Sequence, residues 1–304
     1  MKDSLDELLG RDEVIKVERS SPPVIDALSK HFTTTFPESL FRLWDAGDNI
    51  ALETIDAHIP GATEILQLID EGAWSDPFVE GGFIPVLDDH QSNYLVVIIY
   101  APLAPRIAYL PHDDGGRLLY RDLDGFAKAL LKALDAGESA DLFFHETQGD
   151  YPPDAPRSRT DQDAARALLA TDGTREEWNY ATQLLDASNL AEWAKLLETD
   201  HFVRRDVIAR MQQMHAPAIR ELLRRDRLSF DAFARATAEA ARRAGLKVGE
   251  RRQAVLQIGG KWMNLESFFH RRNIPNAMPR MIAWFEDLIA GRNPHDRAGH
   301  FMAD

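Results

Sequence analysis

The chain has 304 residues, of which 44% are hydrophobic and 28% are charged, and it carries a formal net charge of −14 at pH 7. These proportions are close to those of soluble globular proteins, so a disordered or fibrous chain is excluded, and the length suits two domains of ordinary size. Because the chain has no cysteine, disulfide bonds, thiolate metal sites and cysteine nucleophiles are excluded as well.

No segment has the composition of a membrane span or of an export signal. The longest strongly apolar run, residues 94–104, is about half as long as a membrane-spanning helix requires. Residues 1–11 are charged and lack the hydrophobic core of a signal peptide. Since a chain without cysteine also suits a reducing compartment, we expect a cytoplasmic protein that does not contact a membrane.

The charge is distributed unevenly along the chain. Residues 1–150 hold 11 Lys and Arg against 28 Asp and Glu, a balance of −17, whereas the remaining residues balance at +3. An acidic half repels phosphate backbones and attracts basic proteins through long-range steering. We therefore expect a protein partner with a basic surface rather than nucleic acid. The alternative is that the acidity only keeps the protein soluble.

Three helices are predicted before the first strand. The sequence Ser-Pro-Pro at 21–23 begins one, with proline in its first turn. A second follows Pro37, and we expect Gly47 to end it in a left-handed conformation. A short third helix covers about 63–69. The apolar face of the second helix consists of Leu40, Leu43 and Trp44.

The periodicity then changes from helical to extended. Residues 83–87 and 94–100 are predicted strands, and the unbroken apolar run of the second indicates burial on both of its faces. Residues 106–110 and 118–121 are predicted to pair as a hairpin, because the segment between them is rich in residues that form turns.

A closing helix carries apolar residues on one stripe from Leu123 onward and stops at Gly137. Helices first, consecutive strands next and a helix afterwards predict an α+β domain, with an antiparallel-type sheet and flanking helices. We place this domain at residues 1–148.

Three prolines in the sequence GDYPPDAPRSR mark the clearest boundary in the chain. We predict an extended linker at 149–160 and an all-α domain of stacked helices at 161–304. HEAT-like repeats and a non-repetitive helical bundle both fit its helical spacing.

Several helix starts are marked within 161–304. The spacing of a capping box occurs at 174–177 and again at 189–192. Further helices are expected from about 200, from about 217, over 229–245, as a pair over 249–272, and over 279–289.

Residues that could support catalysis or bind a metal are sparse. Two triplets, 88–90 and 112–114, group a histidine with aspartates, a combination that can bind a divalent ion or move protons. Both fall in predicted turns, where aspartate bonds to its own backbone. Residues 259–261, Gly-Gly-Lys, lack the first glycine and the Ser or Thr of a phosphate loop, and no G-x-S-x-G elbow occurs.

We therefore expect no metal, no cofactor and no enzymatic activity. An unrecognised hydrolase would require a pocket that holds several titratable groups with perturbed pKa values.

Trp74 is the candidate anchor for a protein partner. It lies in a loop among acidic residues rather than on an apolar stripe, and exposed aromatic residues often anchor interfaces. The alternative is that its ring caps the core. The acidic residues that we expect around the partner contact are Asp70, Glu71, Asp76, Glu80, Asp88, Asp89, Asp113 and Asp114.

Three stretches of the first part carry a family resemblance. They are FPESLFRLWDAGD at 36–48, FIPVLDDHQSNYLVVIIY at 83–100, and the strand, His-Asp turn and helix of 106–134. Together they resemble the SUKH superfamily, which includes the Smi and Knr cell-wall regulators of yeast and many bacterial immunity proteins. Asp-Ala-Gly at 45–47 replaces the family's usual Asn-Gly, and Ser92 stands where a glycine is frequent.

The resemblance implies an α+β fold for about residues 20–134, and its motifs mark a fold rather than a catalytic site. Together with the charge, it predicts an immunity protein that binds and neutralises a cognate toxin of a contact-dependent or type VI secretion system. Many such toxins act on nucleic acids through basic clefts, which an acidic domain would occlude. The alternative is an adaptor or regulatory scaffold whose two domains bind different partners.

Overall fold

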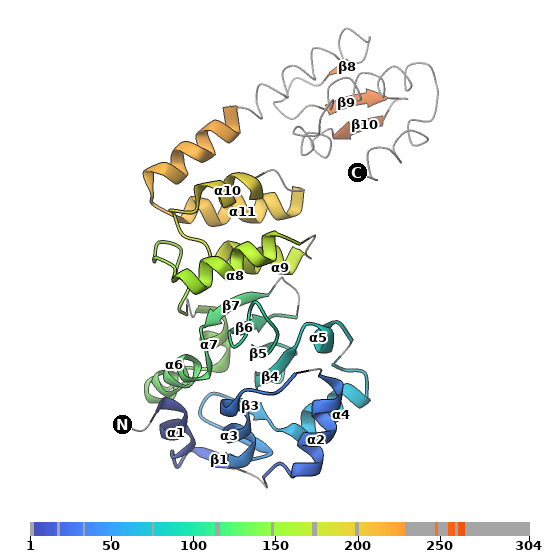
Figure 1. Ribbon diagram of the computed structural model, residues 1–304, viewed down its shortest axis with the longest axis vertical. Coiled ribbons are helices and arrows are strands. Elements are labelled where there is room, and N and C mark those ends of the chain that lie inside the picture. Colours follow the sequence, from blue (N-terminus) through green and yellow to red (C-terminus); the bar gives the residue numbers. More distant parts are fainter. Residues whose placement is uncertain are drawn as a thin grey trace. The chain divides into compact units, whose positions relative to one another are not determined.

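The computed structural model divides the chain into two compact units, Met1–Asp186 and Ala187–Asp304 (Figure 1). None of the helices in the described segments combines the length and the apolar composition that a membrane crossing requires. The segments that the structure describes are 3–16, 19–32, 34–74, 76–112, 116–146, 149–171, 175–197, 201–228, 247–248, 255–258 and 261–264.

A seven-stranded antiparallel sheet lies at the centre of the first unit. Each strand pairs with its neighbour in sequence, so the order across the sheet is β1 to β7 and no crossover is needed. The strands are β1 Val14–Lys16, β2 Asn49–Leu52, β3 Ala57–Pro60, β4 Phe83–Asp88, β5 Tyr94–Ile98, β6 Ile107–Leu110 and β7 Arg117–Tyr120.

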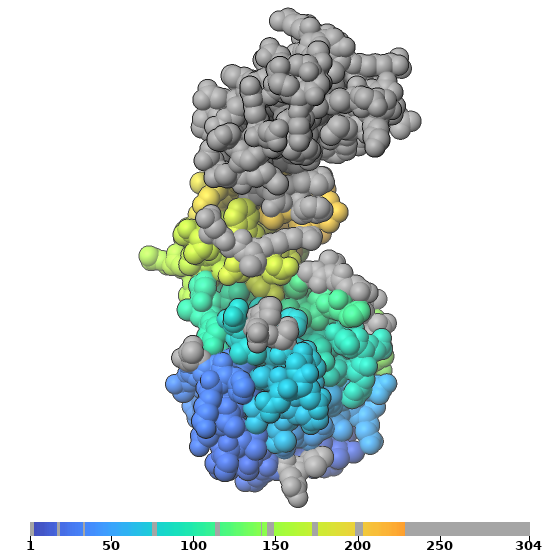
Figure 2. All heavy atoms as spheres, turned by 90° about the vertical axis from the view of Figure 1, so that its right-hand side faces the viewer, coloured from blue at the N-terminus to red at the C-terminus, as the bar shows by residue number. Residues whose placement is uncertain are grey.

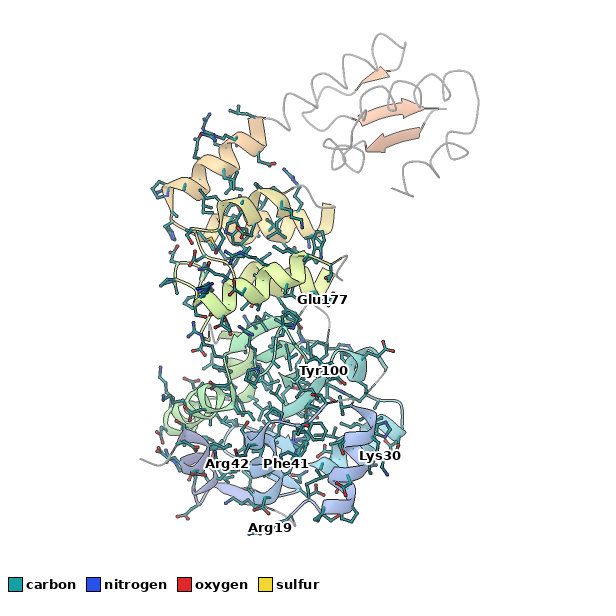
Figure 3. The ribbon with its side chains drawn as sticks, viewed as in Figure 1. Arg19, Lys30, Phe41, Arg42, Tyr100 and Glu177 are labelled. Carbon is teal, nitrogen blue, oxygen red and sulfur yellow. The ribbon has the colours of Figure 1, made fainter. Side chains whose placement is uncertain are left out.

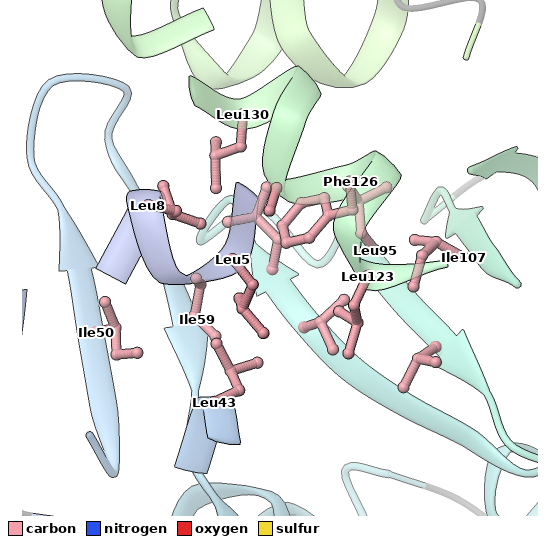
Figure 4. Close-up of a cluster of buried hydrophobic side chains, with 14 of the residues drawn as sticks. Leu5, Leu8, Leu43, Ile50, Ile59, Leu95, Ile107, Leu123, Phe126 and Leu130 are labelled. Atoms are coloured by element: carbon pink, nitrogen blue, oxygen red, sulfur yellow. The ribbon is translucent and has the colours of Figure 1, made fainter. Parts of the chain in front are cut away.

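Helices pack around this sheet and complete the core. Helices α1 and α6 lie side by side although they are far apart in sequence. Figure 4 shows Leu5 and Leu8 of α1 near Phe126 and Leu130 of α6, within one buried apolar cluster. The helices of this unit are α1 Ser4–Leu9, α2 Pro22–His31, α3 Glu38–Ala46, α4 Ala62–Asp70, α5 Asp76–Glu80, α6 Leu123–Ala136, α7 Ala140–Glu146, α8 Arg159–Leu169 and α9 Arg175–Gln183.

The expected α+β architecture of the N-terminal half is confirmed. The predicted helices correspond to α2, α3, α4 and α6, and the predicted strands to β4 to β7. All of β5 after Tyr94 is buried, as expected for a strand covered on both faces. Gly137 ends α6 with a φ of 64°, the left-handed conformation that glycine adopts without strain.

The expectation that Gly47 ends α3 in a left-handed conformation is wrong. Gly47 is extended, with φ −176° and ψ 147°, because the chain continues directly into β2 at Asn49 instead of turning back. Strands β1 to β3 and helix α1 were not predicted, because each is too short to show a clear period in the sequence.

The segment 149–160 lies inside the first unit, together with α8 and α9. Tyr151 and Arg157 are 2% and 5% exposed. The Arg157 guanidinium donates to the carbonyls of Gln183, Ala155 and Pro152. Helix α9 packs against both α8 and β7. The division of the chain into separately folding domains at 149–160 stays a prediction.

The described part of the second unit contains helices and a small sheet. Helices α10 Leu190–Leu196 and α11 His201–Gln213 are followed by a helix over 217–228. The helix starts expected near 200 and 217 are confirmed, whereas the helices expected over 229–245 and 279–289 lie outside the described residues.

The expected helical character of the second part is confirmed by α10 and α11, and the described residues add three short antiparallel strands, β8 Lys247–Val248, β9 Val255–Ile258 and β10 Lys261–Asn264. The expected helix pair over 249–272 is therefore wrong at β9 and β10. Glycine is a poor helix former, and a Gly-Gly pair between two short runs favours a hairpin over a helix.

The capping boxes also differ from expectation. Residue 174 lies outside the described segments, and Asn189 precedes α10 without a capping hydrogen bond from its side chain. A capping box forms instead at the start of α8. There the Ser158 hydroxyl accepts from the Asp161 amide, and the Asp161 carboxylate accepts from the Ser158 amide.

Candidate functional site

A pocket with a volume of about 1060 Å³ opens in the first unit. Most of its lining comes from residues 73–116, which are coloured cyan and green on the face shown in Figure 2, and the rest from α8 and α9. Tyr100 and Glu177, two of the lining residues, are labelled in Figure 3. The aromatic residues of the lining are Trp74, Phe78, Phe83, Tyr94, Tyr100 and Tyr180.

Trp74 is part of the pocket wall and is only 3% exposed. Its indole Nε1 donates to the Phe83 carbonyl at 3.0 Å. The ring stacks on Phe78, with 4.6 Å between centroids, and meets the Tyr94 ring edge-on at 5.1 Å. The sequence left open whether this residue anchors a partner or caps the core. In this conformation its ring is covered, so a partner reaches it only through the pocket.

Tyr180 of α9 brings an unpaired polar atom to the same pocket. The residue is 1% exposed, and its hydroxyl has no hydrogen-bond partner among the described residues. Burial raises the pKa of Tyr180, and the nearby charge of Glu176 raises it further. The hydroxyl therefore stays protonated and is available to donate a hydrogen bond to a ligand.

Gly116 makes room for the Tyr180 hydroxyl. A Cβ atom added at Gly116 would lie 2.5 Å from the Tyr180 oxygen and 2.9 Å from Leu110 Cδ2. Only glycine fits at this position without displacing the pocket lining.

Three carboxylates, from Glu80, Glu176 and Glu177, also line the pocket. The surrounding sequence is strongly acidic, since residues 43–105 contain eleven Asp and Glu and neither Lys nor Arg. Burial raises the pKa of Tyr94, and the charges of neighbouring carboxylates add to the effect. Aromatic faces and carboxylates together favour a ligand that carries an apolar body and a positive charge.

Two tyrosines of the pocket lining, Tyr94 and Tyr180, have raised pKa values. A tyrosine with a raised pKa stays protonated at neutral pH, whereas a nucleophile or general base has to lose its proton.

A second group of polar residues joins β3, β4 and the turn after β4. His58 on β3 pairs in register with Asp88 at the end of β4. His58, Asp88 and His90 each direct one potential ligand atom to a place where all three atoms lie within 4.8 Å of one another. The rings of His58 and His90 stack, with 4.7 Å between centroids and 12° between planes.

Glu64 of α4 binds the other side of the His58 ring, with 2.8 Å between Oε1 and Nε2. Burial alone would lower the pKa of His58, but the hydrogen bond and the charge of Glu64 outweigh it, so the pKa is raised. Burial raises the pKa of Asp88. The shift of His58 reflects the negative charge of the carboxylates beside it, whereas the shift of Asp88 reflects its burial.

The turn after β4 explains why two of the predicted partner residues do not project from the surface. Asp88 and Asp89 are 9% and 6% exposed. Asp88 Oδ1 accepts from the His90 amide at 2.7 Å, and Asp89 Oδ1 accepts from the amides of Gln91 and Asn93. The turn interpretation of these aspartates is therefore confirmed.

The other predicted partner residues are distributed differently. Asp70, Glu71 and Glu80 are exposed, and Glu80 also lines the pocket. Asp76 begins α5, while Asp113 and Asp114 lie outside the described residues. The pocket thus brings together Trp74 and Glu80 from the predicted set.

Sequence reasoning missed His58, Glu64 and Tyr180. His58 lies on a strand that was not predicted, and Tyr180 lies on a helix that was assigned to the other domain. The sequence signal at this place is the triplet at 88–90, which groups a histidine with two aspartates; consecutive side chains cannot form a coordination shell alone, so a metal site there would need a ligand from elsewhere in the chain.

No protein-family model matches this chain, and no curated protein matches it.

Proposed function

We propose that this protein is an immunity protein, which binds a cognate bacterial toxin in the cytoplasm and blocks it by protein–protein contact without catalysis. The observation that carries the proposal is the pocket, where six aromatic rings and three carboxylates line one cavity of the acidic first unit. This combination suits a basic segment of a partner protein.

The pocket chemistry matches the side chain of arginine or lysine. A guanidinium or ammonium group gains energy over aromatic faces, and its apolar stem fills the space between the rings. Carboxylates at Glu80, Glu176 and Glu177 supply the opposite charge. A toxin that acts on nucleic acids has a basic cleft, so occupying that cleft with an acidic protein would exclude its substrate.

The long-range charge supports the same partner. Residues 1–150 have a formal balance of −17, and no Lys or Arg interrupts residues 43–105. A field of one sign accelerates association with a protein of opposite sign. The resemblance of residues 20–134 to the SUKH superfamily is the second line of support, and the antiparallel sheet with flanking helices is compatible with it.

The experiment is co-expression with the protein encoded immediately upstream, followed by co-purification and a growth assay. We expect a stable complex and rescue of growth. The double variant Glu80→Gln with Glu176→Gln should raise the Kd about threefold to tenfold, mainly through slower association that is sensitive to salt.

The matched control removes two exposed acids that do not line the pocket, Asp26→Asn with Glu53→Gln, and so changes the net charge equally. We expect the control to bind nearly as well as the natural sequence. Equal weakening by both double variants would contradict a role for the pocket, and a failure of the toxin to bind at all would contradict the proposed function.

An adaptor is the second candidate, because the chain divides into two compact units. An adaptor binds two different proteins at once, whereas an inhibitor needs only the toxin. Pull-downs with the full chain distinguish them: in an adaptor, the Glu80→Gln and Glu176→Gln variant should lose one partner and keep the other.

A further inference from the structure

His58, Asp88 and His90 converge from separate places in the sequence. The pairing of β3 with β4 brings His58 opposite Asp88, and the turn after β4 returns His90 to the same place. His90 has a φ of 60°, which is uncommon for a residue with a side chain. The hydrogen bond from its amide to Asp88 Oδ1 supports this conformation.

Among the described residues, one nitrogen of the His58 ring has a hydrogen-bond partner and the other has none. The residue is only 8% exposed, and its Nδ1 has no hydrogen-bond partner among the described residues. A buried polar atom without a partner is unfavourable, and in most proteins it is paired or binds an ion or water. This nitrogen is an observation independent of the convergence of the three side chains.

Glu64 sets the ring up as a metal ligand. Its Oε1 lies 2.8 Å from Nε2 of His58, so the carboxylate accepts a hydrogen bond from Nε2–H, and Nδ1 of the neutral ring keeps its lone pair. Asn49 Nδ2 donates to the other Glu64 oxygen at 3.2 Å and orients the carboxylate. A carboxylate that holds the far nitrogen of a histidine is the usual support for a histidine that ligates a metal.

The carboxylates around this site also favour the binding of a cation. No Lys or Arg of the described residues forms an ion pair with Glu64 or Asp88, and residues 43–105 contain none. The second oxygen of Asp88, Oδ2, has no hydrogen-bond partner among the described residues. This contrasts with Asp89, whose two oxygens accept from the backbone and from the Asn93 side chain.

We infer that His58, Asp88 and His90 form a binding site for a divalent transition-metal ion of the zinc class. Two imidazoles and one carboxylate favour zinc, cobalt or nickel over calcium or magnesium, which prefer oxygen ligands. Three protein ligands leave one position of a tetrahedral ion for water or for a ligand.

Metal binding requires a small rearrangement. Ligand atoms around tetrahedral zinc lie about 3.4 Å apart, since each bond is about 2.1 Å, whereas the present separations reach up to 4.8 Å. His90 is exposed and can turn out of its stack on His58 to shorten them. His58 and Asp88 are buried on neighbouring strands and would stay in place.

The ion would act where the sheet is least extensively paired. β3 and β4 share one register pair, His58 with Asp88, whereas the other neighbouring strands share three to five. An ion bound to both residues would tie β1 to β3 to the rest of the sheet. This inference does not depend on the proposed toxin binding.

The test uses the full chain after treatment with a chelator and measures Zn²⁺ affinity by calorimetry, thermal unfolding with and without Zn²⁺, and the visible spectrum of added Co²⁺. We expect a higher Tm with Zn²⁺ and the intense absorption bands of tetrahedral Co²⁺. His90→Asn should weaken Zn²⁺ binding at least about tenfold while keeping the turn, because asparagine tolerates a positive φ. Glu64→Gln should weaken it about tenfold to a hundredfold.

His31→Ala is the control, since His31 is an exposed histidine at the end of α2. It should leave the Co²⁺ spectrum and the Zn²⁺ affinity unchanged. An unchanged spectrum and affinity in both His90→Asn and Glu64→Gln would overturn the inference, even if buried variants such as His58→Gln fail to fold. Tight binding of Mg²⁺ or Ca²⁺ in preference to Zn²⁺ would overturn the choice of metal.

Discussion

Two buried aspartates of the first unit, Asp161 and Asp88, differ in the charge that faces them. Asp161 is 2% exposed, and its carboxylate accepts from the Arg106 guanidinium at 2.7 Å and from the Ser158 hydroxyl. Burial alone would raise the pKa of Asp161, but these partners lower it below the ordinary value. Asp88 is 9% exposed, faces histidines instead of arginine, and has a raised pKa.

The contrast separates a structural cluster from a candidate binding site. Arg106 and Asp161 neutralise each other's charge and connect the residue before β6 to α8. Around Asp88 the negative charges outnumber the fixed positive ones, and a nitrogen of His58 is unpaired. Buried charge that lacks a counter-charge within the chain indicates a place for a ligand.

The largest effect on stability is expected from breaking the buried ion pair of Arg106 with Asp161. Arg106→Ala leaves the Asp161 carboxylate buried without its main partner and should lower the free energy of unfolding by about 3–5 kcal/mol. Urea denaturation of the full chain measures this loss. Arg19→Ala is the control, because the ion pair of Arg19 with Asp45 is exposed and contributes only about 0–1 kcal/mol.

A double variant checks the cause. Replacing both Arg106 and Asp161 by apolar residues of similar size should restore much of the stability that Arg106→Ala loses, since no buried charge remains unpaired. A double variant as unstable as the single one would show that the loss comes from packing rather than from charge.

A smaller effect is expected from neutralising each aspartate. Asp161→Asn should cost about 1.5–3 kcal/mol, because a charged hydrogen bond to Arg106 is lost. In metal-free protein, Asp88→Asn should cost less than about 1 kcal/mol, because the amide oxygen still accepts from the His90 amide and no ion pair is broken. Equal losses from the two variants would contradict the difference between the clusters.

The smallest expected effect is on how the free energy of unfolding depends on pH in acid. The pKa of Asp161 is lowered in the folded state, so its ionisation stabilises the fold above the unfolded value near pH 4. This stability is lost as the pH falls through the folded pKa. Asp161→Asn should therefore flatten the decline of stability below about pH 4, as measured by urea midpoints at a series of pH values.

Local signals in the sequence were sufficient for several elements of the fold. The prolines after Ser21 start α2, because proline fixes its own φ at a helical value. Gly137 ends α6, because glycine adopts a positive φ without strain. Neither effect depends on the surrounding fold. The apolar run of β5 predicts a strand buried on both faces, and Asp89 forms a turn with its own backbone. The uneven charge is likewise a property of the sequence alone.

Tertiary contacts decided the sites. His58 and Asp88 are thirty residues apart in the sequence, and only the pairing of β3 with β4 makes them neighbours. Trp74 has the sequence context of a surface residue, yet it is buried because Phe78 and Tyr94 cover its ring. Tyr180 reaches the pocket because α9 packs on β7. Such contacts join segments that are far apart in the sequence. The periodicity of a sequence reflects local structure, so it does not show which distant segments lie next to each other in the fold.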